Sequence, residues 1–319
     1  MIIIGIGGFL GHDASAALIV DGEVVAAAQE ERFTGKKHDK SFPHHAIRFC
    51  LEKGKKSPEE VTHVAFTENP FTVQTFNSPF RSLSKMGEIA DSLFPMRWAS
   101  SFHNEALKIF PNASGFGTNH HKTHVSASFL LSGFSESAFL CVDGKGENYC
   151  ATFGSVSQKG VEILGRQGFE NGLGMLYTIV THFLGFLSFG DEYKVMGLAP
   201  YGEPVYVDEI SSMFRTCEKG RLRLKSRHSW RRLDGIREMQ ECLGFPMRKP
   251  DEPIDQSHKD VAASIQAIFE SEILKLARHT QELAGNRSHL IFTGGCAQNC
   301  VAAGKLSRSG IFDSVFVSP

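Results

Sequence analysis

Ala138-Phe139-Leu140-Cys141-Val142-Asp143-Gly144-Lys145-Gly146-Glu147-Asn148 is a short apolar run that ends in a polar, glycine-rich turn. The apolar part predicts a buried β-strand because it is short and is followed by turn residues. Residues 149–154 predict the returning strand, and a turn over 158–160 leads into a third strand over 161–164. The order is therefore strand, polar turn, strand, turn, strand.

The start of the chain has the same order. Residues 2–8 predict a buried strand, and residues 12–20 and 23–29 predict two more, joined by the hairpin signal Asp21-Gly22. Two copies of one unit predict a duplicated α/β fold with two lobes, over 1–135 and 136–319. This arrangement resembles the actin-like, ribonuclease H-like superfamily of actin, hexokinase and the heat-shock ATPases. In that superfamily the two polar turns grip nucleotide phosphates in a cleft between the lobes.

Other glycine turns suit the same kind of ligand. Gly294-Gly295 lies between a predicted strand and a predicted helix, where its backbone can approach a ligand closely. Lys194, in a glycine-punctuated segment, is either an anion contact or a solvated loop lysine. Asp13 and Asp143, in the two polar turns, suit a metal ion or a positioned water molecule. The residues expected to line the nucleotide are Asp143, Gly144, Gly146, Lys194, Gly294, Gly295 and Asn299.

A pair of histidines lies between the two copies of the repeat. In Asn119-His120-His121-Lys122-Thr123-His124, helical spacing would place His120 and His124 on one face, where two imidazoles can bind one metal ion. The metalloprotease helix is excluded because no glutamate follows the first histidine. Polar histidines at the exposed start of a helix are the alternative interpretation.

Apolar residues at helical spacing predict the remaining helices. These cover residues 43–54, a short turn at 57–60, residues 173–186, residues 260–283 and a segment after Asn299. Residues 67–100 read as a loop-containing insertion, rich in Phe, Ser, Asn and Pro, whose function the sequence does not indicate.

Composition excludes several classes of protein. The chain has 319 residues, 41% of them hydrophobic and 22% charged, with a formal net charge of -1. This charge gives no general attraction to nucleic acid or to acidic membranes. The apolar start at residues 1–4 is too short for a signal peptide or a membrane span, so a cytoplasmic location is expected.

Seven cysteines without a CxxC pair are expected to be buried, reduced thiols. Cys296 and Cys300 have helical spacing, for which a buried face of small residues is a better explanation than a metal site. The basic run over 215–232 is either an exposed edge strand protected by charge or a nucleic-acid strip, and the net charge favours the edge strand.

These motifs, taken together and in order, resemble those of the O-carbamoyltransferases, a family that includes the nodulation-factor, cephalosporin and aminoglycoside carbamoyltransferases. The resemblance extends from residue 2 to residue 317. The segments that carry it are His12-Asp13-Ala14-Ser15-Ala16-Ala17, Glu30 to Asp39, His120 to His124, Val142 to Glu147, Lys194 to Gly202 and Thr293 to Cys300.

The resemblance implies a reaction. A smaller, separate adenylate-forming domain would make carbamoyl-adenylate from carbamoyl phosphate and ATP, and the actin-like domain would pass the carbamoyl group to a hydroxyl of an acceptor. His120 and His124 would ligate a divalent metal, expected to be Fe²⁺. His12 would be the general base at the reacting centre, with Asp13 beside it, because a hydroxyl nucleophile needs a base near neutral pH.

The resemblance also implies that a further carboxylate ligand and the adenylate-forming domain would follow Pro319. A non-catalytic nucleotide-binding or assembly subunit of the same fold is therefore the alternative function. A sugar kinase of the superfamily is less favoured, because a pair of histidines at helical spacing has no role in phosphoryl transfer to a sugar.

Overall fold

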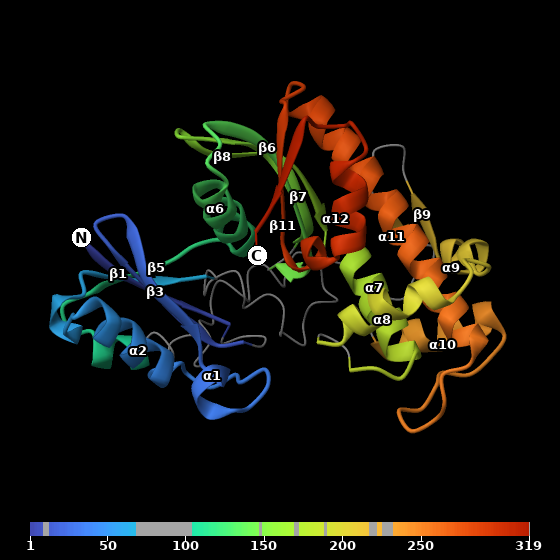
Figure 1. Cartoon of the computed structure of the whole chain (residues 1–319), viewed down its shortest axis with the longest axis horizontal. Helices are drawn as coiled ribbons and strands as arrows, with labels where there is room; N and C mark the ends of the chain where they lie inside the picture. The colour runs from blue at the N-terminus through green and yellow to red at the C-terminus, as the bar shows by residue number, and fades with distance from the viewer. Residues whose placement is uncertain are drawn as a thin grey trace, which may run out of the picture. The chain divides into compact units, whose positions relative to one another are not determined.

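Figure 1 shows the computed structural model of the chain, in which two compact units are each built on a five-stranded sheet. The structure describes residues 1–8, 13–67, 104–146, 149–168, 172–187, 190–216, 222–224 and 232–318. The units are Met1–Thr123 and His124–Pro319. This division falls inside one helix, whereas the lobes expected from sequence divide just after it.

The first unit contains three strands that pair in sequence order, followed by helices and two parallel strands. Its elements are β1 (Ile2–Gly7), β2 (Ser15–Val20), β3 (Glu23–Gln29), α1 (Glu31–Thr34), α2 (His44–Gly54), η1 (Pro58–Glu60), β4 (His63–Phe66), a helical segment over 104–109 and β5 (Ser114–Gly117).

The sheet of the first unit has the order β3-β2-β1-β4-β5. The β1–β2 and β2–β3 pairs are antiparallel, and the β1–β4 and β4–β5 pairs are parallel. Asp21 and Gly22 both have positive φ, of 51° and 93°, so the predicted hairpin turn is confirmed. One face of the sheet, including Ile4 and Leu18, packs against α2 in a closed core.

The second unit begins with α6 (His120–Ser132), whose first residues precede the unit boundary. Its other elements are β6 (Glu136–Gly146), β7 (Tyr149–Ser157), β8 (Gly160–Gly168), α7 (Leu173–Phe183), α8 (Glu192–Leu198), η3 (Ala199–Tyr201), α9 (Val207–Ser212), β9 (Phe214–Thr216), β10 (Leu222–Leu224), α10 (Arg232–Leu243), α11 (Gln256–Leu283), β11 (His289–Thr293), η4 (Gly295–Gln298), α12 (Cys300–Ser307) and β12 (Ser314–Val317).

The sheet of the second unit repeats the topology of the first. Its order is β12-β11-β6-β7-β8, with β6, β7 and β8 antiparallel and β6, β11 and β12 parallel. Strands β6, β7 and β8 thus correspond to β1, β2 and β3, while β11 and β12 correspond to β4 and β5. The predicted duplication of an α/β unit is therefore confirmed.

Helices cover both faces of the second sheet (Figure 1). On one face Leu140 and Phe292 pack against α7, α11 and α12. On the other face Phe139 and Ile291 pack against α6. Neighbouring residues of β6 and β11 pack on different helices because successive side chains of a strand point to opposite faces of the sheet.

Three details differ from the sequence-based expectation. The polar turn expected over 143–148 is in part strand, because β6 extends to Gly146 after a register shift that begins at Val142. Helix α11 begins at Gln256 rather than at 260, because the side chain of Asp255 caps it. Cys300 is exposed, so the prediction of a buried thiol there is wrong, whereas Cys50, Cys141 and Cys150 are buried as predicted.

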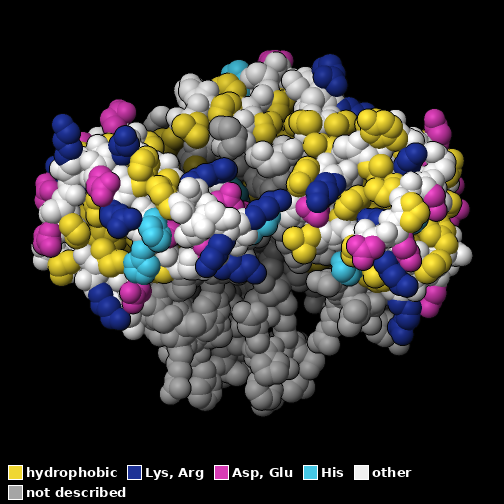
Figure 2. Space-filling model, turned by 60° about the horizontal axis from the view of Figure 1, so that its bottom comes forward, with side chains coloured by type: hydrophobic (Ala, Val, Ile, Leu, Met, Phe, Trp, Pro, Cys, Tyr) yellow, Lys and Arg dark blue, Asp and Glu magenta, His cyan; other side chains and the backbone are white. Residues whose placement is uncertain are grey.

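The surface agrees with the small net charge. On the face drawn in Figure 2, positive and negative side chains are interspersed among hydrophobic ones. In the basic run, β10 pairs with β9 in a two-stranded sheet, as expected of an edge strand, and the rest of this run and the insertion over 68–100 lie outside the described residues. Among the described helices, none has both the length and the apolar character needed to cross a bilayer.

Candidate metal centre

The predicted histidine helix is present as α6. Asn119 precedes it and caps it, because its side-chain oxygen accepts a hydrogen bond from the backbone N–H of Lys122 at 3.2 Å. His120 and His124 are one helical turn apart and half-buried, and His121 between them is only 2% exposed. The alternative of histidines at an exposed helix start therefore does not describe this segment.

Packing against the sheet fixes the position of α6. Val125 and Phe129, on the side of the helix next to His124, contact Phe139 and Ile291 on β6 and β11. The hydroxyl of Ser128 lies 2.9 Å from that of Thr293, and both side chains are buried. His124 is thus held on the face of the sheet where β6 ends.

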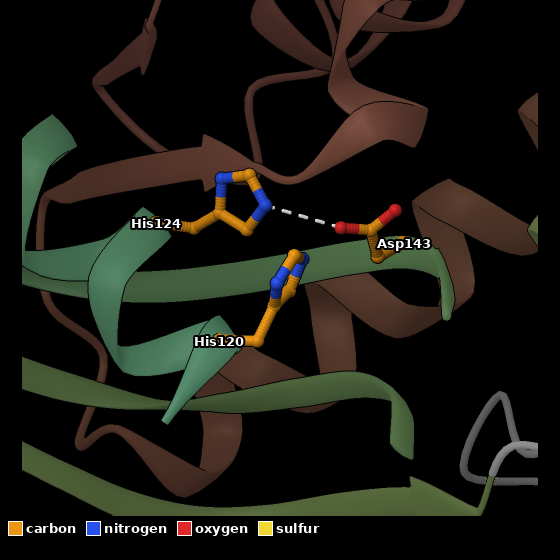
Figure 3. Close-up of side chains that lie close together, drawn as sticks. All are labelled: His120, His124 and Asp143. Atoms are coloured by element: carbon orange, nitrogen blue, oxygen red, sulfur yellow. Dashed lines mark hydrogen bonds and ion pairs between the residues drawn. The ribbon is translucent and has the colours of Figure 1, made fainter. Parts of the chain in front are cut away.

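Asp143 meets the histidines at that end. Its Oδ2 atom lies 3.1 Å from Nε2 of His124, and its Oδ1 atom accepts a hydrogen bond from the backbone N–H of Gly144 at 2.7 Å. One ligand atom from each of His120, His124 and Asp143 lies within 4.8 Å of the other two. Figure 3 shows the two imidazole rings and the carboxylate converging on one space.

Glycines allow the chain to close tightly around Asp143. Gly294 has a φ of 88°, and a Cβ atom built on it would lie 2.4 Å from the carbonyl oxygen of Val142. A Cβ on Gly295 would lie 3.0 Å from Oδ1 of Asp143, and one on Gly174 would lie 2.9 Å from the Asp143 carbonyl oxygen. The Gly-Gly turn predicted to approach a ligand therefore packs directly against the carboxylate.

The donor set fits a divalent transition metal. Two imidazoles and one carboxylate are borderline and hard ligands that suit Fe, Mn, Co or Zn, and two histidines with one carboxylate make the facial set of non-haem Fe²⁺ sites. The sequence identified both histidines and named Asp143 for either a metal or a nucleotide. It did not show that Asp143 is the carboxylate that joins the pair, because no motif spacing links residues 124 and 143.

Asp13 lies in a second cluster, in the first unit. Its Oδ1 atom is 2.9 Å from Nδ1 of His38, and the backbone N–H of His38 donates to Oε2 of Glu31 at 2.9 Å. Asp13 and His38 both have left-handed backbones, with φ of 64° and 57°. Such conformations are costly outside glycine and concentrate at functional sites. His12, the predicted base, lies outside the described residues.

The loop that presents His38 is anchored by Asp39. The carboxylate of Asp39 accepts hydrogen bonds from the hydroxyl and backbone N–H of Ser41 and from the hydroxyl of Thr34. These bonds lower the pKa of Asp39 to about 2. The carbonyl of Asp39 also accepts from the N–H of Ala14, so the loop is tied to the backbone next to Asp13.

Comparison with known proteins identifies the chain. The model of the carbamoyltransferase N-terminus matches residues 2–319. The nodulation protein NolNO of Sinorhizobium fredii is 33% identical over 97% of this chain and 44% of its own length. The chain belongs to the carbamoyltransferase family. An uncharacterized protein of Synechocystis sp. is 35% identical over 99% of this chain and 54% of its own length.

The carbamoyltransferase chain spans about half the length of these relatives. Its fold is that of actin-like proteins. Component A of (R)-2-hydroxyglutaryl-CoA dehydratase from Acidaminococcus fermentans superposes with a TM-score of 0.50 at 14% identity, over 100% of this chain and 92% of that one. This likeness concerns the fold alone.

The remaining residues expected at the nucleotide differ in their surroundings. Gly144 has open space around it, since a Cβ built there would meet no atom within 4 Å. Lys194 pairs with Asp191 at 3.0 Å, and this hydrogen bond raises the pKa of the lysine. Asn299 caps α12 by accepting from the N–H of Ala302, and its amide pairs with Gln266 in both directions. The roles of these residues, and of Gly146, toward a nucleotide stay predictions.

Proposed function

We propose that this chain transfers a carbamoyl group from carbamoyl-adenylate to a hydroxyl of a small-molecule acceptor, at a metal centre held by His120, His124 and Asp143. The observation that carries the proposal is the convergence of the three side chains, with ligand atoms within 4.8 Å of one another. It occurs in a chain whose family is that of the carbamoyltransferases. The fold is one in which the corresponding turns bind nucleotides.

The proposed reaction is an acyl transfer with a simple balance of bonds. The acceptor oxygen forms a bond to the carbamoyl carbon, and the bond between that carbon and the phosphate oxygen of the adenylate breaks. AMP leaves with the electron pair, and the acceptor proton passes to a base. His12 is the proposed base, by family resemblance, and the contact with His38 holds the side chain of Asp13, the next residue in the sequence.

The metal proposed for the site is Fe²⁺, on the basis of the donor set. A divalent ion there would act as a Lewis acid toward an adenylate oxygen. The protein itself orients the side chains that would bind the metal. The N–H of Gly144 holds one carboxylate oxygen of Asp143, while packing of α6 through Val125 and Phe129 holds His124 over the other. Such supporting contacts fix ligand geometry before the metal binds.

The donor is proposed to come from outside this stretch of chain. Carbamoyl-adenylate would be made from carbamoyl phosphate and ATP by an adenylate-forming domain, either in a longer chain or in a partner protein. The relatives are about twice as long as the matched region, which leaves room for such a domain in them.

The test supplies the intermediate directly. Synthetic carbamoyl-adenylate is added to the purified chain loaded with Fe²⁺ under anaerobic conditions, together with 4-(hydroxymethyl)benzoate, N-acetylglucosamine or kanamycin as acceptor. Mass spectrometry then measures the carbamate ester, and chromatography measures acceptor-dependent release of AMP. We expect ester formation with at least one acceptor, and its loss in His120→Ala, His124→Ala and Asp143→Ala.

A matched control lies on the same helix. Lys122 is exposed in the first turn of α6, so Lys122→Ala removes a side chain there without touching the proposed ligands. It should keep the activity of the wild type. Equal ester formation by wild type and His124→Ala would contradict the proposal. Binding of ATP without transfer to any acceptor would contradict it too, and would favour the non-catalytic nucleotide-binding subunit.

A further inference from the structure

A hollow of about 710 Å³ opens on one face of the sheet in the first unit. Its floor is formed by Gly5, Gly7, Ser15, Ala17, Ala27 and Gln29. The volume lies within the range of about 300–1,000 Å³ that is usual for sites of small molecules. Its described lining residues do not include His120, His124 or Asp143, and neither the fold nor the proposed metal centre requires it.

The hollow follows from the alternation of the strands. Gly5 pairs with Ala17 and Ala17 with Ala27, while Gly7 pairs with Ser15 and Ser15 with Gln29, so all six residues share one face. The opposite face carries Ile4, Ile6 and Leu18, which pack into the core with α2. Ile6, Ala16 and Ala28 of that face and Phe49 of α2 also line the hollow. Around the hollow, one face of these strands is therefore filled with large side chains, while the other carries small or polar ones, with Ile3 and Ile19 further along the strands.

The hollow lies at the functional end of this sheet. Strands β1, β4 and β5 are parallel, so their carboxyl ends meet at one edge, where ligands of α/β sheets bind. Gly7 ends β1, and Thr67, which follows β4, also lines the hollow. The hydroxyl of Thr123, next to His124 in sequence, lies 3.5 Å from the carbonyl oxygen of Thr67. The wall of the hollow thus touches the first turn of the histidine helix.

The lining favours a particular chemistry. Phe33 and Phe49 form an aromatic wall, with ring centroids 5.6 Å apart. Among the lining residues that the structure describes, Arg32 is the charged one. Its side chain is 70% exposed, and its guanidinium lies 3.3 Å from the side-chain oxygen of Gln29 and 3.6 Å from a carboxylate oxygen of Glu31. A polyol would lose its hydrogen bonds to water there and find few hydrogen-bond partners among these side chains. A polyamine would be repelled by the positive charge of Arg32.

We propose that this hollow is the acceptor pocket, and that the acceptor is a hydroxy compound with a flat, largely apolar body and an anionic group facing Arg32. The proposal rests on the carbamoyl transfer proposed above and narrows its acceptor class. The apolar body lies on the glycine and alanine floor against Phe33 and Phe49. The anion pairs with Arg32, while the hydroxyl points toward the strand ends marked by Gly7 and Thr67.

The test measures binding without turnover. The full chain is labelled with ¹³C in its alanine methyl groups and titrated with 4-(hydroxymethyl)benzoate, with neutral 1,4-benzenedimethanol and with cationic 4-(aminomethyl)benzyl alcohol. We expect shifts of the Ala17 and Ala27 methyl signals, strongest for the anion and weakest for the cation. The methyl of Ala46, buried in α2 on the other face, serves as the reference and should not shift.

Two variants test the shape of the hollow and the charge of Arg32 separately. Ala27→Leu should fill the hollow and abolish the Ala17 shift, whereas Val24→Leu, on the same strand at a position 64% exposed and outside the hollow, should not. Arg32→Gln should reduce the preference for the anion over the neutral probe by roughly two- to fivefold, the range of an exposed ion pair. Both positions tolerate change because their side chains are largely exposed.

Several results would overturn the pocket. These are unshifted Ala17 and Ala27 signals up to the solubility of all three probes, equal binding by Ala27→Leu, or tighter binding of the cation than of the anion. The experiment uses neither metal nor carbamoyl donor, so its failure is distinct from failure of the transferase proposal. If wild type and Ala27→Leu carbamoylate 4-(hydroxymethyl)benzoate with the same KM, the proposed acceptor pocket is contradicted. The carbamoyl-transfer proposal would still stand.

Discussion

Nε2 of His124 and Oδ2 of Asp143 lie 3.1 Å apart, although the two residues are separated by 19 positions and belong to a helix and a strand. The contact exists because α6 packs on the sheet through Val125 and Phe129. Asp143 lies near the end of β6, next to the part of the sheet that α6 covers. The proposed metal centre therefore depends on how α6 packs on β6 and β11.

Gly294 should be intolerant of any side chain. Gly294→Ala places a Cβ 2.4 Å from the carbonyl oxygen of Val142, at a φ of 88°. We expect a loss of at least the roughly 1–3 kcal/mol of unfolding free energy that such backbone regions cost a non-glycine residue, together with weaker metal binding. Gly310→Ala is the control, since its φ is 70° but no atom lies within 4 Å of the new Cβ. Equal losses in urea unfolding would show that the contact with Val142 is unimportant.

The hydrogen bond between Ser128 and Thr293 should stabilise the position of α6. Ser128→Ala removes one of two buried hydroxyls 2.9 Å apart and leaves the other without this partner. The expected loss in unfolding free energy is about 1–3 kcal/mol. Ser126→Ala, at an exposed position of the same helix, should change stability by less than about 0.5 kcal/mol. A loss as large at Ser126 would indicate an effect on helix formation rather than on docking.

Asp39 should make stability depend on pH in the acid range. Its folded-state pKa is about 2, below the ordinary value of 3.8, because Ser41 and Thr34 donate hydrogen bonds to the carboxylate. A lowered pKa stabilises the fold above the unfolded value, so this stability is complete above about pH 4 and is lost as the pH falls toward about 2. The advantage of wild type over Asp39→Asn should shrink across that window. A carboxyl titration by NMR with a midpoint near the ordinary value would contradict the assignment.

The cysteines should differ in their reactivity. Burial raises the pKa of Cys50 to about 11 and that of Cys150 to about 12, whereas Cys300 is exposed. Iodoacetamide at mildly alkaline pH should therefore alkylate Cys300 in the folded protein and reach Cys50 and Cys150 only after unfolding, because the thiolate is the nucleophile. Peptide mapping of wild type and Cys300→Ser checks this. Rapid labelling of Cys50 in the native protein would show that the α2 core opens readily.

Much of the fold follows from local sequence. The duplicated unit was predictable because the strand runs at residues 2–8 and 138–142, each followed by polar and glycine residues, repeat in one order. The parallel strands and their placement beside β1 and β6 follow from the topology that the repeat implies. The extension of β6 to Gly146 was not predictable, because it depends on an irregular register with β7.

The site was predictable only in part. Helical spacing placed His120 and His124 together, but the addition of Asp143 depends on docking of α6 on the sheet. The contact of Asp13 with His38 was missed, because it needs two residues in left-handed conformations that no pattern in the sequence specifies. A signal was present in hindsight: both residues belong to segments that carry the family resemblance.

The affinity of the chain for a divalent metal, measured by anaerobic titration with Fe²⁺ or with Co²⁺ as a spectroscopic substitute, decides whether the proposed metal centre exists. We predict one site per chain, with affinity reduced in His120→Ala, His124→Ala and Asp143→Ala by more than the roughly 10–100-fold that loss of a supporting residue costs. Lys122→Ala should bind as wild type does. Unchanged affinity in Asp143→Ala, or no stoichiometric binding by the folded wild-type chain, would contradict a metal site at these three residues.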